Sequence, residues 1–148
     1  MLKAKDIMTA DVISAKPAMT VEELARILIE HKISGAPVVD DGNRLVGIVT
    51  EHDLIKKNKR FHIPTMIRLF DAYFLLDSDR VEEDIKKMVA ITVEEICNKK
   101  VVSITEDTSL EDIATIMSEQ NIHLLPVLND GIVVGIVGKA DVVRSMTK

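Results

Sequence analysis

The chain contains one sequence pattern twice, and this repetition limits its fold more than any other feature. Residues 6–56 align with residues 95–144 when a single gap is placed opposite Asn43. Each copy is therefore expected to be one supersecondary unit that buries its apolar face against the other copy. Two copies predict a pseudo-twofold pair with two equivalent clefts where the copies meet. The matched positions include Ile7/Ile96, Ser14/Ser103, Glu22/Glu111, Ala25/Ala114, Pro37/Pro126, Gly42/Gly131, Gly47/Gly135 and Asp53/Asp141.

Each copy has the pattern β-α-β-β-α. Residues 12–14 and 101–104 are short β-favouring runs. Thr20 and Ser109 each precede a carboxylate by three positions, which is the capping-box pattern of a helix start. The helix that follows has apolar residues at helical spacing on one face. These residues are Val21, Leu24, Ala25 and Leu28 in the first copy, and Leu110, Ile113, Ala114 and Met117 in the second.

A hairpin and a final helix complete each copy. An Asp-Gly pair between two apolar runs predicts a tight turn between antiparallel strands. Because the strands are apolar almost throughout, both of their faces are expected to be covered. The expected strands are 37–40 and 44–50 around the turn 41–42, and 126–129 and 132–138 around the turn 130–131; the last helices begin at Thr50 and Gly138.

Composition excludes several classes of function. With 148 residues, 47% hydrophobic and 29% charged, the chain reads as a soluble globular protein. A net charge of −5, no Trp and 3% aromatic residues argue against nucleic-acid binding. No apolar run reaches the roughly 20 residues that cross a bilayer, and the N-terminus lacks a signal-peptide pattern. The single cysteine, Cys97, favours a reducing compartment, so we expect a cytoplasmic location and no membrane contact.

Residues 57–94 interrupt the repeat. The segment 61–74 contains the aromatic residues of the chain at mostly helical spacing, and Asp79 opens a second expected helix with a capping box. Two interpretations remain open: the aromatic side chains cover one end of the shared core, or they form a contact surface for a second subunit or a client protein.

These residues resemble a known family, the CBS domain, which occurs as tandem pairs called Bateman modules. The resemblance rests on a hydrophobic-Pro-Val segment, an Asp-Gly turn and Gly-Ile-Val-x-x-x-Asp, present in both copies. It implies an α+β fold of two repeats packed sheet to sheet, with residues 1–56 and 95–148 as the repeats and residues 57–94 as a helical insert. It also implies a homodimer, no catalytic activity, and an adenosine-containing ligand such as AMP, ADP, ATP or S-adenosylmethionine. Whether Mg²⁺ accompanies ATP stays open, and no obligatory cofactor is expected.

The segment from Gly47 to Asp53 is the strongest candidate site. The N-terminus of the helix after Thr50 offers free N–H groups and a positive dipole end to an anion such as phosphate. Thr50 and His52 could add hydrogen bonds to the phosphate. Asp53 is an acceptor that suits the two hydroxyls of a ribose. The alternative is that Thr50 and Asp53 form only a capping box and need no ligand.

The resemblance also implies which residues share each cleft. The adenine is expected to be held by the other repeat, through main-chain groups and apolar side chains. The first cleft combines Thr50, His52 and Asp53 with Val101, Val102, His123, Leu125 and Pro126, and the second combines Gly138, Lys139, Ala140 and Asp141 with Val12, Ile13, Ser34, Ala36 and Pro37.

The second copy departs from the family pattern at Gly138, where a Thr or Ser is usual. The hydroxyl is lost there, so we expect the two sites to differ in affinity. Lys139 or Lys32 could supply phosphate charge instead, or be a solvated surface residue. His123 could contact phosphate or be a satisfied core histidine.

The remaining reactive residues do not suggest catalysis. Cys97 aligns with Met8 and is expected to be a small apolar packing residue. The four histidines lack the paired spacing of a metal site, so no metal is predicted. Three functions remain: a regulatory ligand sensor, a structural dimerisation module with no retained ligand, and, least favoured, an enzyme.

Overall fold

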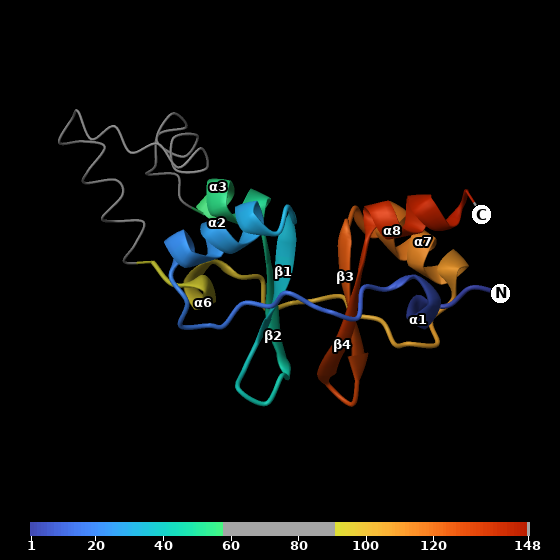
Figure 1. Cartoon of the computed structure of the whole chain (residues 1–148), viewed down its shortest axis with the longest axis horizontal. Coiled ribbons are helices and arrows are strands. Elements are labelled where there is room, and N and C mark those ends of the chain that lie inside the picture. Colours follow the sequence, from blue (N-terminus) through green and yellow to red (C-terminus); the bar gives the residue numbers. More distant parts are fainter. Residues whose placement is uncertain (58–90, 148) are drawn as a thin grey trace. The chain divides into compact units, whose positions relative to one another are not determined.

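The computed structural model describes residues 1–57 and 91–147, which form two compact units of mixed helix and strand. Each unit contains one two-stranded antiparallel sheet with helices on one side of it (Figure 1). This confirms the α+β class. Unit 1 consists of Met1–Ile13, Val39–Leu45 and Lys100–Lys148, and unit 2 of Ser14–Val38 and Val46–Lys99.

Unit 2 is built on the hairpin of the first repeat. Strand β1 (Gly35–Val39) is buried along its whole length, as the apolar sequence predicts, and pairs with β2 (Leu45–Thr50). The helices are α2 (Val21–Glu30), α3 (Glu51–Lys57) and α6 (Val93–Ile96). Leu24, Leu28 and Leu54 are among the largest fully buried side chains of this core.

Unit 1 repeats this arrangement with the second hairpin. Strand β3 (Leu124–Asn129) pairs with β4 (Ile132–Gly138), and the register shifts by one residue between Val127 and Leu128. The helices are α1 (Ala4–Ile7), α7 (Leu110–Gln120) and α8 (Lys139–Ser145). Ile113, Leu125 and Val137 are completely buried in its core.

Helices α2 and α7 begin where their capping residues predict. The hydroxyl of Thr20 accepts a hydrogen bond from the N–H of Glu23 at 3.1 Å, and the hydroxyl of Ser109 accepts one from the N–H of Asp112 at 3.1 Å. Each bond satisfies an N–H that the first turn of a helix leaves without a partner. Helix α7 is followed by Asn121, whose left-handed conformation is typical of a residue that caps a helix C-terminus.

The short helices α1 and α6 each pack with the hairpin of the opposite repeat. Thr9, which follows α1, exchanges two backbone hydrogen bonds with Ile136 of β4. Asn98, which follows α6, does the same with Ile48 of β2. The sequence alignment did not reveal this exchange. Each compact unit therefore contains segments from both repeats. The domain boundaries 1–56 and 95–148 follow the sequence repeat and stay a prediction.

The first β element of each repeat is shorter than the sequence pattern predicts. Residues 12–14 contain no strand, and only Ala15 forms a parallel bridge, to Val38. In the second repeat the corresponding parallel bridge joins Ile104 to Val127. The remaining predicted strands and helices of the repeats form near the expected residues. The helices expected within the insert, and the aromatic segment 61–74, fall outside the described residues.

Cys97 is a packing residue, as its alignment with Met8 predicts. It is 8% exposed and belongs to the core of unit 2. Burial raises the pKa of its thiol, because the thiolate loses solvation, and the nearby carboxylates of Glu94 and Asp53 act in the same direction against Lys99. A thiol that stays protonated is a poor nucleophile.

Within residues 1–57 and 91–147, no helix combines the length and the apolar character needed to cross a membrane.

The glycines of β2 and β4 predict an unequal response to the same substitution. A Cβ at Gly47 would lie 2.8 Å from the carbonyl oxygen of Asn98, which is already hydrogen-bonded to Ile48. A Cβ at Gly135 would instead meet the flexible side chain of Met8. Overpacking a core costs about 1–3 kcal/mol, so we expect Gly47→Ala to lower the midpoint of urea unfolding clearly and Gly135→Ala to lower it less. Equal losses in the two variants would contradict this explanation.

Candidate functional site

The first candidate site is the junction between β2 and α3. Oδ2 of Asp53 accepts hydrogen bonds from the N–H of Thr50 at 2.9 Å and from the Thr50 hydroxyl at 3.2 Å. The N–H of Asp53 points back to the hydroxyl oxygen of Thr50 at 3.4 Å. The predicted capping box is therefore present, and it holds the half-buried carboxylate in one orientation at the end of the strand.

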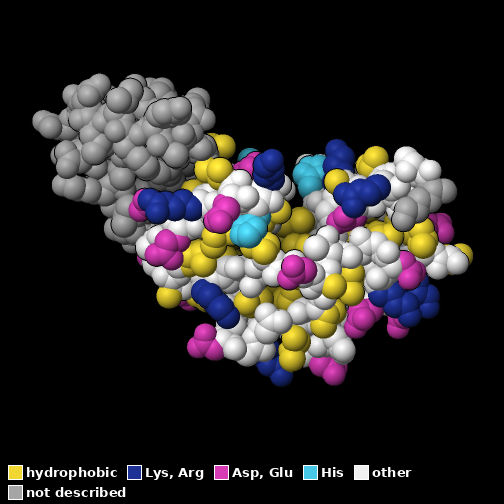
Figure 2. Space-filling model, viewed as in Figure 1, with side chains coloured by type: hydrophobic (Ala, Val, Ile, Leu, Met, Phe, Trp, Pro, Cys, Tyr) yellow, Lys and Arg dark blue, Asp and Glu magenta, His cyan; other side chains and the backbone are white. Residues whose placement is uncertain are grey.

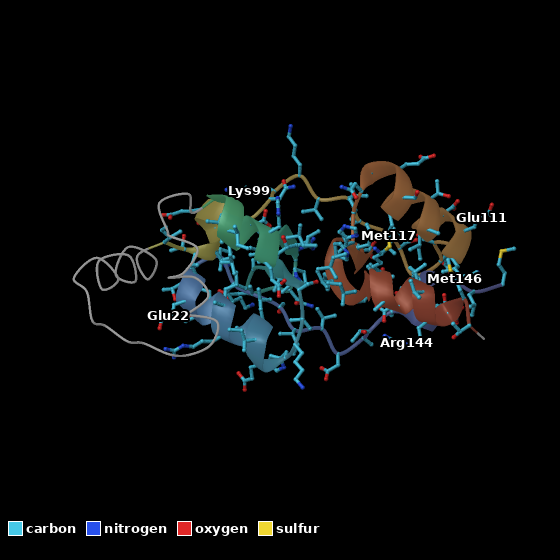
Figure 3. The ribbon with its side chains drawn as sticks, turned by 90° about the horizontal axis from the view of Figure 1, so that it is seen from above. Glu22, Lys99, Glu111, Met117, Arg144 and Met146 are labelled. Carbon is cyan, nitrogen blue, oxygen red and sulfur yellow. The ribbon has the colours of Figure 1, made fainter. Side chains whose placement is uncertain are left out.

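The second candidate site is the junction between β4 and α8. Oδ2 of Asp141 accepts a hydrogen bond from the N–H of Gly138 at 2.8 Å, which reproduces the backbone bond of the first junction. The other oxygen, Oδ1, lies 3.5 Å from Nη1 of Arg144, which comes from α8 (Figure 3). The Asp141 side chain is 12% exposed, whereas the Arg144 side chain is 68% exposed. The ion pair therefore joins a largely buried carboxylate to a side chain at the protein surface.

The missing hydroxyl at Gly138 is not forced by packing. A Cβ added at Gly138 would meet no atom closer than 3.7 Å, a normal van der Waals contact. Gly138 also has an extended backbone, with φ −103° and ψ 167°, which any residue can adopt. The second junction could therefore accommodate a Thr or Ser, and its glycine is a difference in chemistry between the two sites.

The residues that precede β1 and β3 each accept a backbone hydrogen bond from the first residue of the last helix of the same repeat. The carbonyl oxygen of Ser34 accepts the N–H of Glu51 at 2.8 Å, and the carbonyl oxygen of His123 accepts the N–H of Lys139 at 3.0 Å. Both Ser34 and His123 are exposed. The family resemblance groups each of them with the junction of the opposite repeat, and these contacts within the same unit were not expected. The exposed position of His123 also contradicts its interpretation as a core histidine.

The N–H groups at the first helix start are mostly occupied. Those of Thr50, Glu51 and Asp53 donate to groups within the chain. The expectation that they are free to bind an anion is therefore wrong for these three residues. The side chains that the sequence suggested for phosphate binding stay predictions for that role. His52 is exposed at the first junction and Lys139 at the second, and Lys32 is exposed at the end of α2.

The two carboxylates differ in the acceptor capacity that they have left. Among residues 1–57 and 91–147, no group donates a hydrogen bond to Oδ1 of Asp53. Oδ1 of Asp141 instead faces Arg144. An ionised carboxylate with one oxygen open can accept from a ligand hydroxyl, so the first junction is the better prepared of the two. Arg144 stands three positions after Asp141, a spacing at which helical side chains meet, so this pair could have been found from the sequence.

The other predicted site residues are placed by the strands and by the segments that precede them. Leu125 packs in the core of unit 1, and the carbonyl oxygens of Pro37 and Pro126 accept the N–H groups of Ala15 and Ile104. Their predicted contacts with an adenine stay predictions. Ala36, Pro37, Leu125 and Pro126 are buried, Val12, Ile13, Val101 and Val102 are half-buried, and Ala140 is exposed.

The described residues offer no metal centre. No group of three or more His, Cys, Asp or Glu side chains with metal-binding geometry occurs within them. Acidic and basic side chains are interspersed on the face seen in Figure 2, without a continuous basic surface.

Comparison with known proteins identifies the family of the repeats. A protein of unassigned function from Methanocaldococcus jannaschii is 29% identical over 95% of this chain and 92% of its own length. The chloroplastic CBS domain-containing protein CBSX1 of Arabidopsis thaliana is 31% identical over 88% of this chain, which spans 57% of that protein. An L-aspartate semialdehyde sulfurtransferase of M. jannaschii is 32% identical, but this chain covers only 22% of it.

Solved structures agree with these sequence relatives. CBSX2 in complex with AMP superimposes with a TM-score of 0.75 at 26% identity, covering 99% of this chain and 97% of the other. The CBS domain pair of protein MJ0100, in complex with 5′-methylthioadenosine and S-adenosyl-L-methionine, gives a TM-score of 0.74 at 30% identity with the same coverage. The CBS domain model matches this chain twice, at residues 4–60 and 93–148. With both repeats matched and the same fold in its solved relatives, the chain belongs to the CBS-domain family as a tandem CBS pair.

Proposed function

We propose that the chain is a regulatory module without catalytic activity that binds an adenosine-containing ligand at the junctions β2–α3 and β4–α8. The observation that carries the proposal is the same carboxylate anchor built twice, with Asp53 and Asp141 each fixed by the N–H at the end of a strand. Two solved relatives support the class of ligand, since CBSX2 binds AMP and MJ0100 binds 5′-methylthioadenosine and S-adenosyl-L-methionine.

The first junction has the chemistry for a nucleoside with phosphate or another polar group on its sugar. Asp53 uses one oxygen for the capping box and keeps the other for a ribose hydroxyl. The Thr50 hydroxyl and the exposed His52 are the groups available to a phosphate. Adenine contacts from the opposite repeat, through Val101, Val102 and their neighbours, stay part of the proposal.

The second junction has a weaker version of the same chemistry. It lacks the hydroxyl of Thr50, and Arg144 competes for the oxygen of Asp141 that a ribose would use. We therefore propose unequal affinities, with the tighter site at Asp53.

Regulation follows from linkage. A ligand changes the balance between two arrangements of the chain only if it binds them with different affinity.

The proposal includes a homodimer, a cytoplasmic location and a client protein that responds to ligand occupancy. Ile55 and Val143, which are aligned positions, are 55% and 54% exposed and would suit a contact with a second copy. If neither junction binds a ligand, the capping boxes serve stability alone and the chain is a structural dimerisation module.

A thermal-shift assay tests the proposal. A ligand at 100 times its dissociation constant adds about 2.7 kcal/mol to stability. We expect AMP, ATP or S-adenosylmethionine to raise the melting temperature, with GMP as a matched control for the base. The double variant Asp53→Ala/Asp141→Ala should show no shift. If none of the three adenosine ligands shifts the wild-type chain, the structural module is the correct reading.

The two carboxylates should contribute unequally. Losing one hydrogen bond to a charged group costs about 1.5–3 kcal/mol, which is about one to two decades in dissociation constant. In calorimetry we expect Asp53→Ala to abolish or weaken the tighter binding event, and Asp141→Ala to affect only the weaker one. Asp41→Ala, in the exposed turn at the opposite end of β2 from the first junction, controls for the change in net charge. Equal losses from the two junction variants would contradict the asymmetry.

Restoring the hydroxyl should strengthen the second site. Gly138→Thr provides the group that Thr50 supplies at the first junction, and Gly138→Ala adds the Cβ without the hydroxyl. A hydrogen bond to a charged group is worth about 1.5–3 kcal/mol. We therefore expect the dissociation constant of the weaker site to fall about tenfold or more in the Thr variant and little in the Ala variant. The same effect in both variants would show that the hydroxyl is not responsible.

A further inference from the structure

The turns of the two hairpins are hydrogen-bonded to each other within unit 1. The N–H of Leu45 donates to the carbonyl oxygen of Gly131 at 3.2 Å, and the N–H of Val133 donates to the carbonyl oxygen of Asn43 at 3.1 Å. These two bonds flank an antiparallel bridge between Arg44 and Ile132. The pairing covers backbone groups that the start of β4 would otherwise leave open at its edge.

Asn43 adds a third bond that has no counterpart in the other turn. Its side-chain amide Nδ2 donates to the carbonyl oxygen of Val133 at 3.0 Å. The position that corresponds to Asn43 in the second turn is Gly131, because each has a left-handed backbone, with φ of 62° and 82°, and each offers its carbonyl to the opposite turn. The sequence alignment instead matched Gly131 with Gly42 and placed the gap opposite Asn43. A glycine has no side chain with which to make this bond.

The first turn is arranged to present Asn43. Oδ1 of Asp40 accepts the N–H groups of Gly42 at 2.9 Å and Arg44 at 3.0 Å, and the carbonyl oxygen of Asp40 accepts the N–H of Asn43 at 3.0 Å. Asn is one of the few residues other than Gly that adopt the left-handed conformation at low cost. A neighbouring contact, from Nη1 of Arg44 to the carbonyl oxygen of Asp130 at 3.4 Å, lies on the same pair of turns.

We propose that Asn43 clasps the two hairpin turns into one cooperative unit, a conformational device that opens and closes without unfolding either core. Residues 41–44 are exposed, whereas Leu45 and Ile132 are half-buried and Val133 is buried, so opening the clasp breaks hydrogen bonds and requires only the exposed first turn to move. Regions of this kind open locally at a free energy below that of global unfolding. The clasp joins residues that are 90 positions apart in the chain. The proposal does not depend on any ligand.

Amide hydrogen exchange followed by NMR tests the clasp through Asn43→Gly. Glycine adopts the left-handed conformation freely, so this variant keeps the turn and removes only the side-chain bond. A neutral hydrogen bond contributes about 0.5–1.5 kcal/mol, so the amides of Val133 and Leu45 should both exchange about two- to tenfold faster. Asn43→Asp replaces the donating amide by a carboxylate, whose oxygen repels the carbonyl oxygen of Val133. This variant should raise the exchange rates of both amides further. The amide of Thr9, bonded to Ile136 on the same strand, should keep its rate.

Asn121→Gly is the matched control, because Asn121 is also left-handed, with φ 54°, but ends α7 away from the turns. It has the same effect on the flexibility of the unfolded chain and should leave both clasp amides unchanged. Acceleration of Val133 alone, with Leu45 at its wild-type rate, would show that the turns open independently and would overturn the proposal. Unchanged rates at both amides in Asn43→Gly, or equal acceleration in Asn121→Gly, would overturn it as well.

Discussion

The structure depends on the backbone pairing between each hairpin and a segment from the opposite repeat. A two-stranded hairpin is marginal in water by itself, and its edges expose unpaired N–H and C=O groups. Asn98 pairs with Ile48 of β2, and Thr9 pairs with Ile136 of β4. This pairing explains why Gly47 must be a glycine, since the carbonyl of Asn98 comes too close for a Cβ. It also holds the two strands whose last residues are the candidate binding junctions.

The two junctions share an anchor and differ in what surrounds it. Both fix an aspartate through the N–H of the residue that ends a strand. Thr50 adds a hydroxyl to its N–H, whereas Gly138 contributes only its N–H, and the second oxygen of Asp141 lies 3.5 Å from Arg144. A duplicated fold therefore does not require duplicated chemistry. An affinity difference between the sites would let a chain of this kind respond to two ranges of ligand concentration, a consequence of the function proposed above.

The sequence predicted most of the fold because its signals are local. The capping residues Thr20 and Ser109, the apolar helix faces and the Asp-Gly turns act within a few positions, and the structure has them as expected. The packing of α1 and α6 with the hairpin of the opposite repeat was not predicted, because the sequence of a repeat does not indicate which of the two hairpins its first helix contacts. The same limit applies to Asn43: alignment treated it as an insertion, while its backbone conformation makes it the partner of Gly131. At the junctions, the capping contacts of the two aspartates followed from the sequence pattern, but the hydrogen bonds that Ser34 and His123 make to the helix starts are tertiary and could not be predicted from spacing.

The measurement that tests the central claim most directly is an NMR titration of the ¹⁵N-labelled chain with AMP. If the junctions bind the ligand, the largest shifts will fall on the amides of residues 50–53 at low AMP concentration and on those of residues 138–141 at higher concentration. Saturating shifts confined to other parts of the chain, or no shifts with AMP, ATP or S-adenosylmethionine, would contradict the account.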